Sequence, residues 1–174
     1  MRPTRTVVSA ALTAAALVGG GIAPSANAGD EWSINGTFAA TSDGTYATTD
    51  YKFHTEDTVK SVWTITSTCT GEGAHCTGQV SSDQGWSAPI YSEGHVWYLD
   101  RDIPNWETCP DSDISFPGHQ TFQFYPANAN GVTQIGSGYL EGKDKTVGPR
   151  FACGTYWYGK PLVIVMQFRL DRIG

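Results

Sequence analysis

Five acidic residues lie close together near the middle of the chain: Asp100, Asp102, Glu107, Asp111 and Asp113. Two carboxylates that flank one bond can hydrolyse a glycoside, and several carboxylate oxygens can ligate calcium. The run Asp-Ser-Asp at 111–113 lacks the remaining ligand positions of a calcium-binding loop. A hydrolase that uses these carboxylates is therefore one hypothesis, and solvated loop charges are the simpler explanation of the same residues.

The four histidines, His54, His75, His95 and His119, are scattered over expected strand ends and loops. None is framed by a nucleophile motif such as Gly-x-Ser-x-Gly or by a zinc motif such as His-Glu-x-x-His. We interpret all four as surface residues. The sequence thus predicts no catalytic residue, no metal ligand and no cofactor.

Aromatic residues indicate binding more strongly. Trp86, Trp106 and the run Tyr156, Trp157 and Tyr158 lie in expected loops rather than at alternating strand positions. Successive side chains of an extended segment point to opposite sides, so we expect at least one ring of the run to be exposed. Exposed rings with polar atoms suit sugars, peptides and protein partners. These five residues form the predicted ligand-binding set, and the alternative is that they cap the ends of the core.

The four cysteines, Cys69, Cys76, Cys109 and Cys153, are even in number, which is typical of a disulfide framework in exported proteins. We expect the pairs Cys69–Cys76 and Cys109–Cys153, because the stretch 70–75 reads as a hairpin loop whose ends are already close. Zinc held by Cys69, His75 and Cys76 is the alternative, although the chain contains no Cys-x-x-Cys pair.

The elements that position the acidic, aromatic and cysteine residues are short runs of β-branched and aromatic residues. Helical periodicity is nearly absent after residue 28. The pattern predicts an all-β antiparallel meander of about eight strands that closes into a barrel or a sandwich. The stretch 102–119 contains several prolines and is expected to be irregular and pinned by Cys109. Turns are expected at 42–44, 71–74, 92–94, 128–131 and 142–144. The expected strands are 34–40, 46–54, 58–68, 76–82, 95–101, 121–125, 134–141 and 162–172.

The last expected strand shows the clearest alternation. The face opposite the expected core turns polar toward the end of the strand, with Gln167, Arg169 and Asp171. The face expected in the core consists of Leu162, Ile164, Met166, Phe168 and Leu170.

A large lined cavity in the barrel would favour a carrier of small ligands, whereas an interior crowded with Trp63, Phe122, Phe124, Met166 and Phe168 would exclude one.

The first 28 residues are typical of a secretory signal peptide. A basic start with Arg2 and Arg5 precedes apolar and small residues over 7–23, and Ala26-Asn27-Ala28 matches the pattern that signal peptidase cleaves. We predict cleavage after Ala28, with a single secreted β domain over 29–174. The protein is then expected in the envelope or the medium, with no lipid anchor and no membrane insertion.

Charge narrows the possible partners. The chain has 11 basic and 17 acidic side chains, a net charge of −6 at pH 7. Removal of Arg2 and Arg5 with the signal peptide makes the mature chain still more acidic. An acidic surface repels phosphate backbones, so we expect no nucleic-acid partner.

Two resemblances accompany these patterns. The start of the first expected strand, Ile34-Asn35-Gly36-Thr37-Phe38, resembles the opening Gly-x-Trp strand of lipocalin-like and avidin-like barrels, with Phe38 in place of Trp. The stretches VWTITSTC (62–69), SDQGWSAP (82–89) and NWETCPD (105–111) resemble a group of small secreted, disulfide-containing proteins from mycobacteria and related actinobacteria. That group has no assigned activity, so the resemblance implies export and disulfides and carries over no catalytic residue.

Taken together, the patterns favour a secreted binding or interaction protein without enzymatic activity. The expected partner is an envelope component, a protein or a small ligand. A hydrolase that uses the acidic residues and a small-ligand carrier with a barrel cavity are the two other hypotheses.

Overall fold

The computed structural model describes residues 30–71, 75–110, 112–154 and 159–174. The predicted signal peptide, Asp111 and the aromatic run Tyr156, Trp157 and Tyr158 lie outside the described residues. In the part of the chain that is described, no helix is both long and apolar enough to cross a membrane.

Strands dominate the described residues, and the helical elements among them are two three-residue 3₁₀ turns, η1 (Asp30–Trp32) and η2 (Ala152–Gly154). The strands are β1 (Gly36–Thr49), β2 (Lys52–Phe53), β3 (Val59–Thr70), β4 (His75–Ser82), β5 (Ser87–Glu93), β6 (Val96–Thr108), β7 (Ser115–Pro126), β8 (Tyr139–Val147) and β9 (Val163–Arg172).

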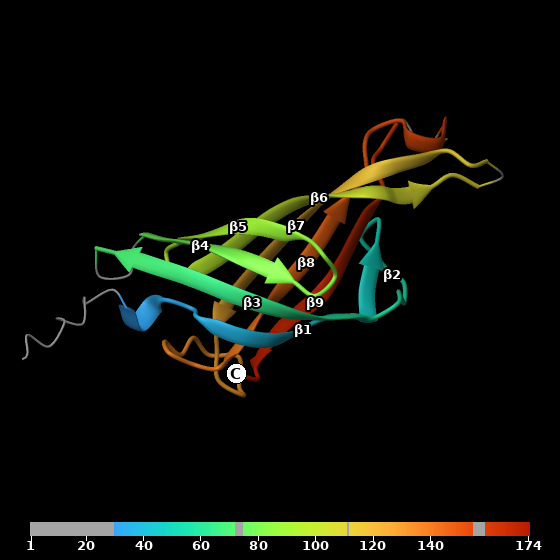
Figure 1. The fold of residues 1–174 in the computed structure, drawn as a ribbon. Coiled ribbons are helices and arrows are strands. Elements are labelled where there is room, and N and C mark those ends of the chain that lie inside the picture. Colours follow the sequence, from blue (N-terminus) through green and yellow to red (C-terminus); the bar gives the residue numbers. More distant parts are fainter. Residues whose placement is uncertain (1–29, 72–74, 111, 155–158) are drawn as a thin grey trace, which may run out of the picture.

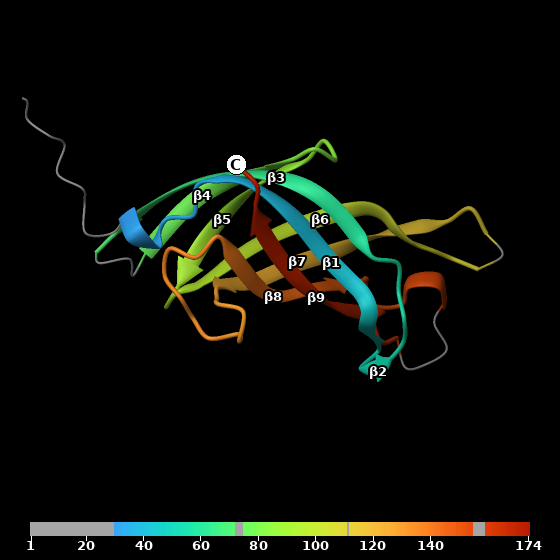
Figure 2. The ribbon, with the colours of Figure 1, turned by 90° about the horizontal axis from the view of Figure 1, so that it is seen from below.

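The strands form a closed antiparallel barrel, as Figures 1 and 2 show. From β3 to β9 each strand pairs with its neighbour in sequence, and β1 pairs with both β3 and β9. The pairing of β1 with β9 closes a ring of eight strands, and short β2 adds to the end of β1. The structure therefore confirms the predicted antiparallel meander, and it selects a barrel over a sandwich.

Aromatic rings fill the middle of the barrel. The ring of Phe168 on β9 lies 5.1 Å from Trp63, 4.7 Å from Phe122 and 5.6 Å from Phe124 between centroids. These four side chains are buried, as the alternating pattern predicts. Ile164 and Met166 are only partly buried, so the core face of β9 is fully enclosed at Phe168 and Leu170.

A polar network lies beside this aromatic core. The buried Asp144 carboxylate accepts a hydrogen bond from Ser42 Oγ at 2.6 Å and bonds from Gln120 Nε2 at 2.8 and 2.9 Å. Gln120 Oε1 accepts a bond from Arg101 Nε at 2.6 Å, and the Arg101 guanidinium lies over the ring of Trp86. The cavity between these residues measures about 20 Å³, which is room for about one water molecule. A small-ligand carrier would need far more space than this cavity offers.

Both predicted disulfides are formed. Cys69 and Cys76 lie opposite each other in the β3–β4 ladder and join its end. Cys109 and Cys153 join the end of the β6–β7 hairpin to η2. In Figure 1 this hairpin projects beyond the rest of the barrel, next to the segment that leads into β9.

Several expected boundaries were wrong. The stretch 102–119 is a hairpin rather than a loop, because β6 continues to Thr108 and β7 begins at Ser115, and its irregularity is confined to a register shift between Ile103 and Glu107. The expected turn at 142–144 lies inside β8, where the alternation places Asp144 in the core. Strand β5 was missed because Pro89 resembles a turn signal; Pro89 is tolerated since pairing with β6 begins only at Ile90.

Candidate functional site

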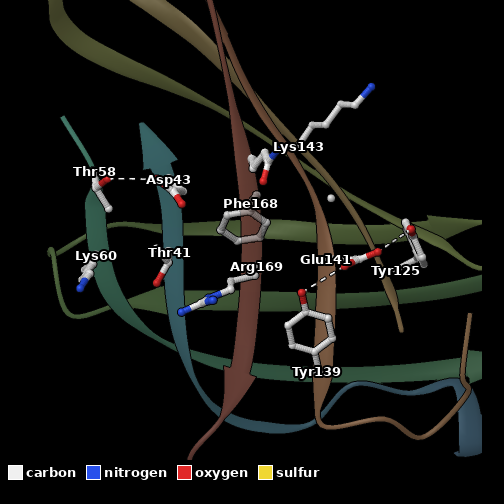
Figure 3. A pocket seen from close by; sticks show the side chains of 12 residues that line it. Thr41, Asp43, Thr58, Lys60, Tyr125, Tyr139, Glu141, Lys143, Phe168 and Arg169 are labelled. Carbon is white, nitrogen blue, oxygen red and sulfur yellow. Dashed lines mark hydrogen bonds between the residues drawn. The ribbon is translucent and has the colours of Figure 1, made fainter. Parts of the chain in front are cut away.

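The candidate site is an open groove on the outer face of the barrel, with a volume of about 650 Å³ (Figure 3). It crosses the seam between β1 and β9, with β3 on one side and β8 and β7 on the other. We call it the seam groove. Its lining residues are Thr41, Asp43, Thr58, Lys60, Tyr125, Tyr139, Glu141, Gly142, Lys143, Gln167, Phe168 and Arg169.

Strand register places the main residues of the seam groove in one row. Arg169 on β9 is paired with Glu141 on β8 and with Thr41 on β1. The row continues outward from Glu141 to Tyr125 on β7, and from Thr41 to Lys60 on β3. Residues paired across an antiparallel ladder point to the same face of the sheet. Five strands therefore contribute one side chain each to a continuous outer surface.

A second row lies beside the first. Lys143 on β8 is paired with Gln167 on β9, and Gln167 is paired with Asp43 on β1. Asp43 begins an irregularity in β1, and its Oδ1 accepts a hydrogen bond from the backbone N–H of Thr45 at 2.9 Å. This bond and those of the Thr45 and Thr58 hydroxyls lower the pKa of Asp43, so the carboxylate is held in its charged form.

Two tyrosines hold the Glu141 carboxylate in place. The Tyr125 hydroxyl donates to Glu141 Oε1 at 2.9 Å, and the Tyr139 hydroxyl donates to Oε2 at 3.0 Å, as Figure 3 shows. The pKa of Tyr125 is raised chiefly by this bond, and the pKa of Tyr139 is raised chiefly by burial. Both hydroxyls therefore keep their protons and remain donors. Glu141 is thus a fixed acceptor with lone pairs still free for a ligand.

The groove carries charges of both signs. Lys60, Lys143 and Arg169 supply three cations, against the carboxylates of Asp43 and Glu141. Arg169 Nε forms an ion pair with Asp171 Oδ2 at 3.2 Å, but a planar guanidinium has five N–H donors and can bind a second group. The side chain of Arg169 is 57% exposed and so is accessible from solvent. The chain as a whole has a net charge of −6, whereas the lining of the groove has three cations against two carboxylates.

This set of side chains is suited to non-covalent binding of a polar ligand. Fixed carboxylates accept hydrogen bonds, the lysines and Arg169 donate them, and the tyrosine rings offer flat contact area. Among the described residues, no group of three or more His, Cys, Asp or Glu side chains is arranged to hold a metal ion.

The two described tryptophans of the predicted ligand-binding set lie elsewhere. Trp86 follows the β4–β5 turn, packs edge-on against Trp63 at 5.3 Å and covers the polar network through Arg101. Trp106 is half-buried in β6, where a Cβ on Gly118 would lie 2.6 Å from its ring. The structure therefore does not place these two rings in the seam groove. Whether they bind a ligand remains a prediction.

The four acidic residues of this set that the structure describes do not gather in one cleft. Asp100 and Asp102 flank exposed His119 on the outer face, with His119 Nδ1 2.9 Å from Asp102 Oδ1 and Nε2 3.7 Å from Asp100 Oδ1. Glu107 lines a separate pocket, and Asp113 is exposed in the β6–β7 turn. All four histidines are exposed, in line with their interpretation as surface residues.

Sequence reasoning did not find the seam groove. The alternation of the last strand placed Gln167 and Arg169 outside, and that was the available signal. Their partners Thr41 and Glu141 come from distant parts of the chain, and only the register of a closed barrel brings them together.

The fold is similar to that of a solved structure described as the monomer form of the M. tuberculosis PknI sensor domain. The TM-score is 0.53 at 14% sequence identity, and the likeness covers 82% of this chain and 88% of that chain. At this identity the likeness shows a shared fold alone. The two disulfides agree with the resemblance to small disulfide-containing proteins. No family model and no curated protein gave a match.

Proposed function

We propose that this chain is a secreted, non-enzymatic binding protein whose seam groove holds an acidic glycan of the cell envelope. The signal peptide is removed after Ala28, and the mature barrel acts outside the cytoplasm. Two disulfides support this location, because such bonds persist in oxidising compartments. The fold supports a role in recognition, since the similar PknI domain is a sensor domain.

The observation that carries the proposal is the pairing of Arg169 with Glu141, whose carboxylate is already held by two tyrosines. A fixed carboxylate beside a guanidinium offers an acceptor and a fork of donors at one place, which suits adjacent hydroxyls of a sugar ring. Tyr125 and Tyr139 are half-buried, so part of each ring remains available for contact with the sugar.

Charge selects an acidic rather than a neutral glycan. Lys60 on β3 ends the first row on one side of the seam, and Lys143 on β8 ends the second row on the other side. Arg169 on β9 lies between these two strands. A chain of sugars with carboxylate groups that crosses the seam would meet these cations in turn. The chain as a whole is acidic, so we expect the cations of the groove to orient an acidic ligand along it.

The direct test is calorimetric titration of the purified mature protein with a tetrameric oligogalacturonate, with neutral maltotetraose as the matched sugar. We expect the acidic sugar to bind, and Arg169→Ala and Glu141→Gln each to weaken binding roughly ten-fold, about 1.4 kcal/mol. Arg150→Ala, an exposed arginine outside the groove, is the control and should leave affinity unchanged. Equal affinity for both sugars, no affinity for either, or an equal loss in the control would overturn the proposal.

A further inference from the structure

A second pocket lies apart from the seam groove and shares no residue with it. It has a volume of about 530 Å³ and lies between the β1–β2 turn, β6 and the segment that leads into β9. This volume is within the range of small-molecule sites. Its lining residues are Asp50, Tyr51, Lys52, Glu107, Lys160, Pro161, Leu162 and Val163.

The β1–β2 turn that forms one wall is held firmly. The Asp50 N–H donates to the carbonyl of Val163 at 2.8 Å, and Asp50 Oδ1 accepts from the N–H of Val163 at 3.1 Å. Asp50 and Tyr51 both adopt left-handed backbone conformations, with φ of 52° and 63°. Such conformations are unfavourable for residues other than glycine, and they persist where the surrounding structure fixes them.

Glu107 forms the opposite wall and has an unsatisfied hydrogen-bond acceptor. Its Oε2 is buried and has no hydrogen-bond partner, and no ion pair found among the described residues includes its carboxylate. A Cβ at position 148 would lie 2.5 Å from this oxygen, so Gly148 leaves the space that the carboxylate occupies. Burial and the nearby Asp50 carboxylate raise the pKa of Glu107. A positively charged ligand group beside this carboxyl would offset both effects, because it favours the ionised form.

Lysines and apolar groups complete the pocket. Lys52 and Lys160 are exposed, and neither takes part in an ion pair within the described residues. Pro161 and Leu162 are half-buried and form an apolar wall, and the side chain of Tyr51 is highly exposed beside them. The pocket therefore combines two carboxyl groups, two ammonium groups and an apolar surface.

We propose that this pocket is a second binding site, and that its ligand is a zwitterionic amino acid with an apolar or aromatic side chain. The α-ammonium group pairs with Glu107 and Asp50. The α-carboxylate pairs with Lys52 and Lys160. The side chain packs on Leu162 and the ring of Tyr51. A simple cation would be repelled by the lysines, and a simple anion would be repelled by the carboxylates, so the zwitterion is the class that meets all four charges.

The experiment is an NMR titration of the mature protein with L-phenylalanine, N-acetyl-L-phenylalanine and L-phenylalaninamide. The last two probes lack the ammonium and the carboxylate charge, respectively. We expect L-phenylalanine to bind and each blocked analogue to bind at least ten-fold more weakly. Absence of binding by L-phenylalanine, or equal binding of all three, would overturn the proposal.

Variants assign the binding to this pocket. Glu107→Gln and Lys160→Ala should each weaken L-phenylalanine binding about ten-fold, whereas Lys145→Ala, an exposed lysine on β8, should leave it unchanged. Glu141→Gln in the seam groove should also leave it unchanged, so the failure of one site is distinguishable from failure of the other. If Glu107→Gln does not fold, Lys160→Ala and the three probes on the unmodified protein still decide the matter. An equal loss of L-phenylalanine affinity in Lys145→Ala would contradict the assignment of the binding site to this pocket.

Discussion

Thr41 and Arg169 lie opposite each other across the seam at which β1 pairs with β9. One belongs to the first long strand and the other to the last strand, so the pair forms only when the barrel closes. Glu141 is the partner of Arg169 on the other side. The seam groove is therefore a product of closure, and loss of the native barrel removes it.

Adjacent residues of β9 should separate stability from binding. Phe168→Ala removes a ring packed against Trp63 and Phe122 and leaves a cavity, so we expect it to lower the free energy of unfolding by about 3–5 kcal/mol. Arg169→Ala, on the exposed face, should change it by no more than about 0.5 kcal/mol while it weakens ligand binding. Urea unfolding of both variants checks this. Equal destabilisation would mean that the faces of β9 are assigned wrongly.

The sequence predicted the class of fold because the relevant signals are local. Alternation in the last strand identifies Phe168 and Leu170 as interior residues. The short sequence separation of Cys69 and Cys76 indicates a bridged hairpin. These inferences need only the period of a strand and the reach of a turn.

The sites could not be predicted, because they depend on register between strands. A cluster of turn-forming residues at 142–144 looks like a loop, yet the barrel needs this segment as the middle of β8, with Asp144 inside. Likewise, the loop expected from the prolines of 102–119 is a hairpin, and Asp102 and Glu107 lie at different positions along its first strand, β6, on either side of a register shift. Tertiary pairing overrides local turn signals at both positions.

The two disulfides should contribute unequally to stability. Cys109 and Cys153 are separated by 44 positions, and Cys69 and Cys76 by 7. A bridge that closes a longer loop removes more entropy from the unfolded chain, so we expect about 4 kcal/mol for the first and about 2.5 kcal/mol for the second. Paired alanine substitutions at each bridge, measured by chemical denaturation, test this order. A larger loss for the Cys69–Cys76 pair would contradict it.

Gly142 should tolerate no side chain. Its Cα lies against the backbone of the neighbouring strand, where a Cβ would overlap the Gln123 carbonyl group and approach Phe124 Cα to 2.6 Å. The β7 backbone is held in the barrel and cannot move aside cheaply, so Gly142→Ala should cost about 1–3 kcal/mol. Gly138→Ala is the control, because the three atoms nearest to its Cβ would all belong to the side chain of Arg172, the closest being Arg172 Cβ at 3.2 Å. Thermal unfolding that ranks the control as the worse variant would refute the packing argument.

Asp144 should make stability depend on pH. Burial raises its pKa above the ordinary value, while the bonds from Ser42 and Gln120 and the charge of Arg101 oppose the shift. The folded protein therefore holds this proton more tightly than the unfolded chain does. The stabilisation that this proton provides is present below the unfolded pKa of about 4 and is lost as pH rises through the raised, folded pKa.

The test of this sign is urea unfolding of the wild type and of Asp144→Asn between pH 3 and pH 8. We expect the stability of the wild type to fall relative to the variant as pH rises, because the amide does not ionise. Ser42→Ala is the matched control within the same network: it keeps the carboxyl group but removes a hydrogen bond that lowers the pKa of Asp144. The folded pKa should then rise further, so this variant should lose stability over a wider range of pH than the wild type. A constant difference between the wild type and Asp144→Asn, or a narrower range in Ser42→Ala, would show that Asp144 is not the group responsible.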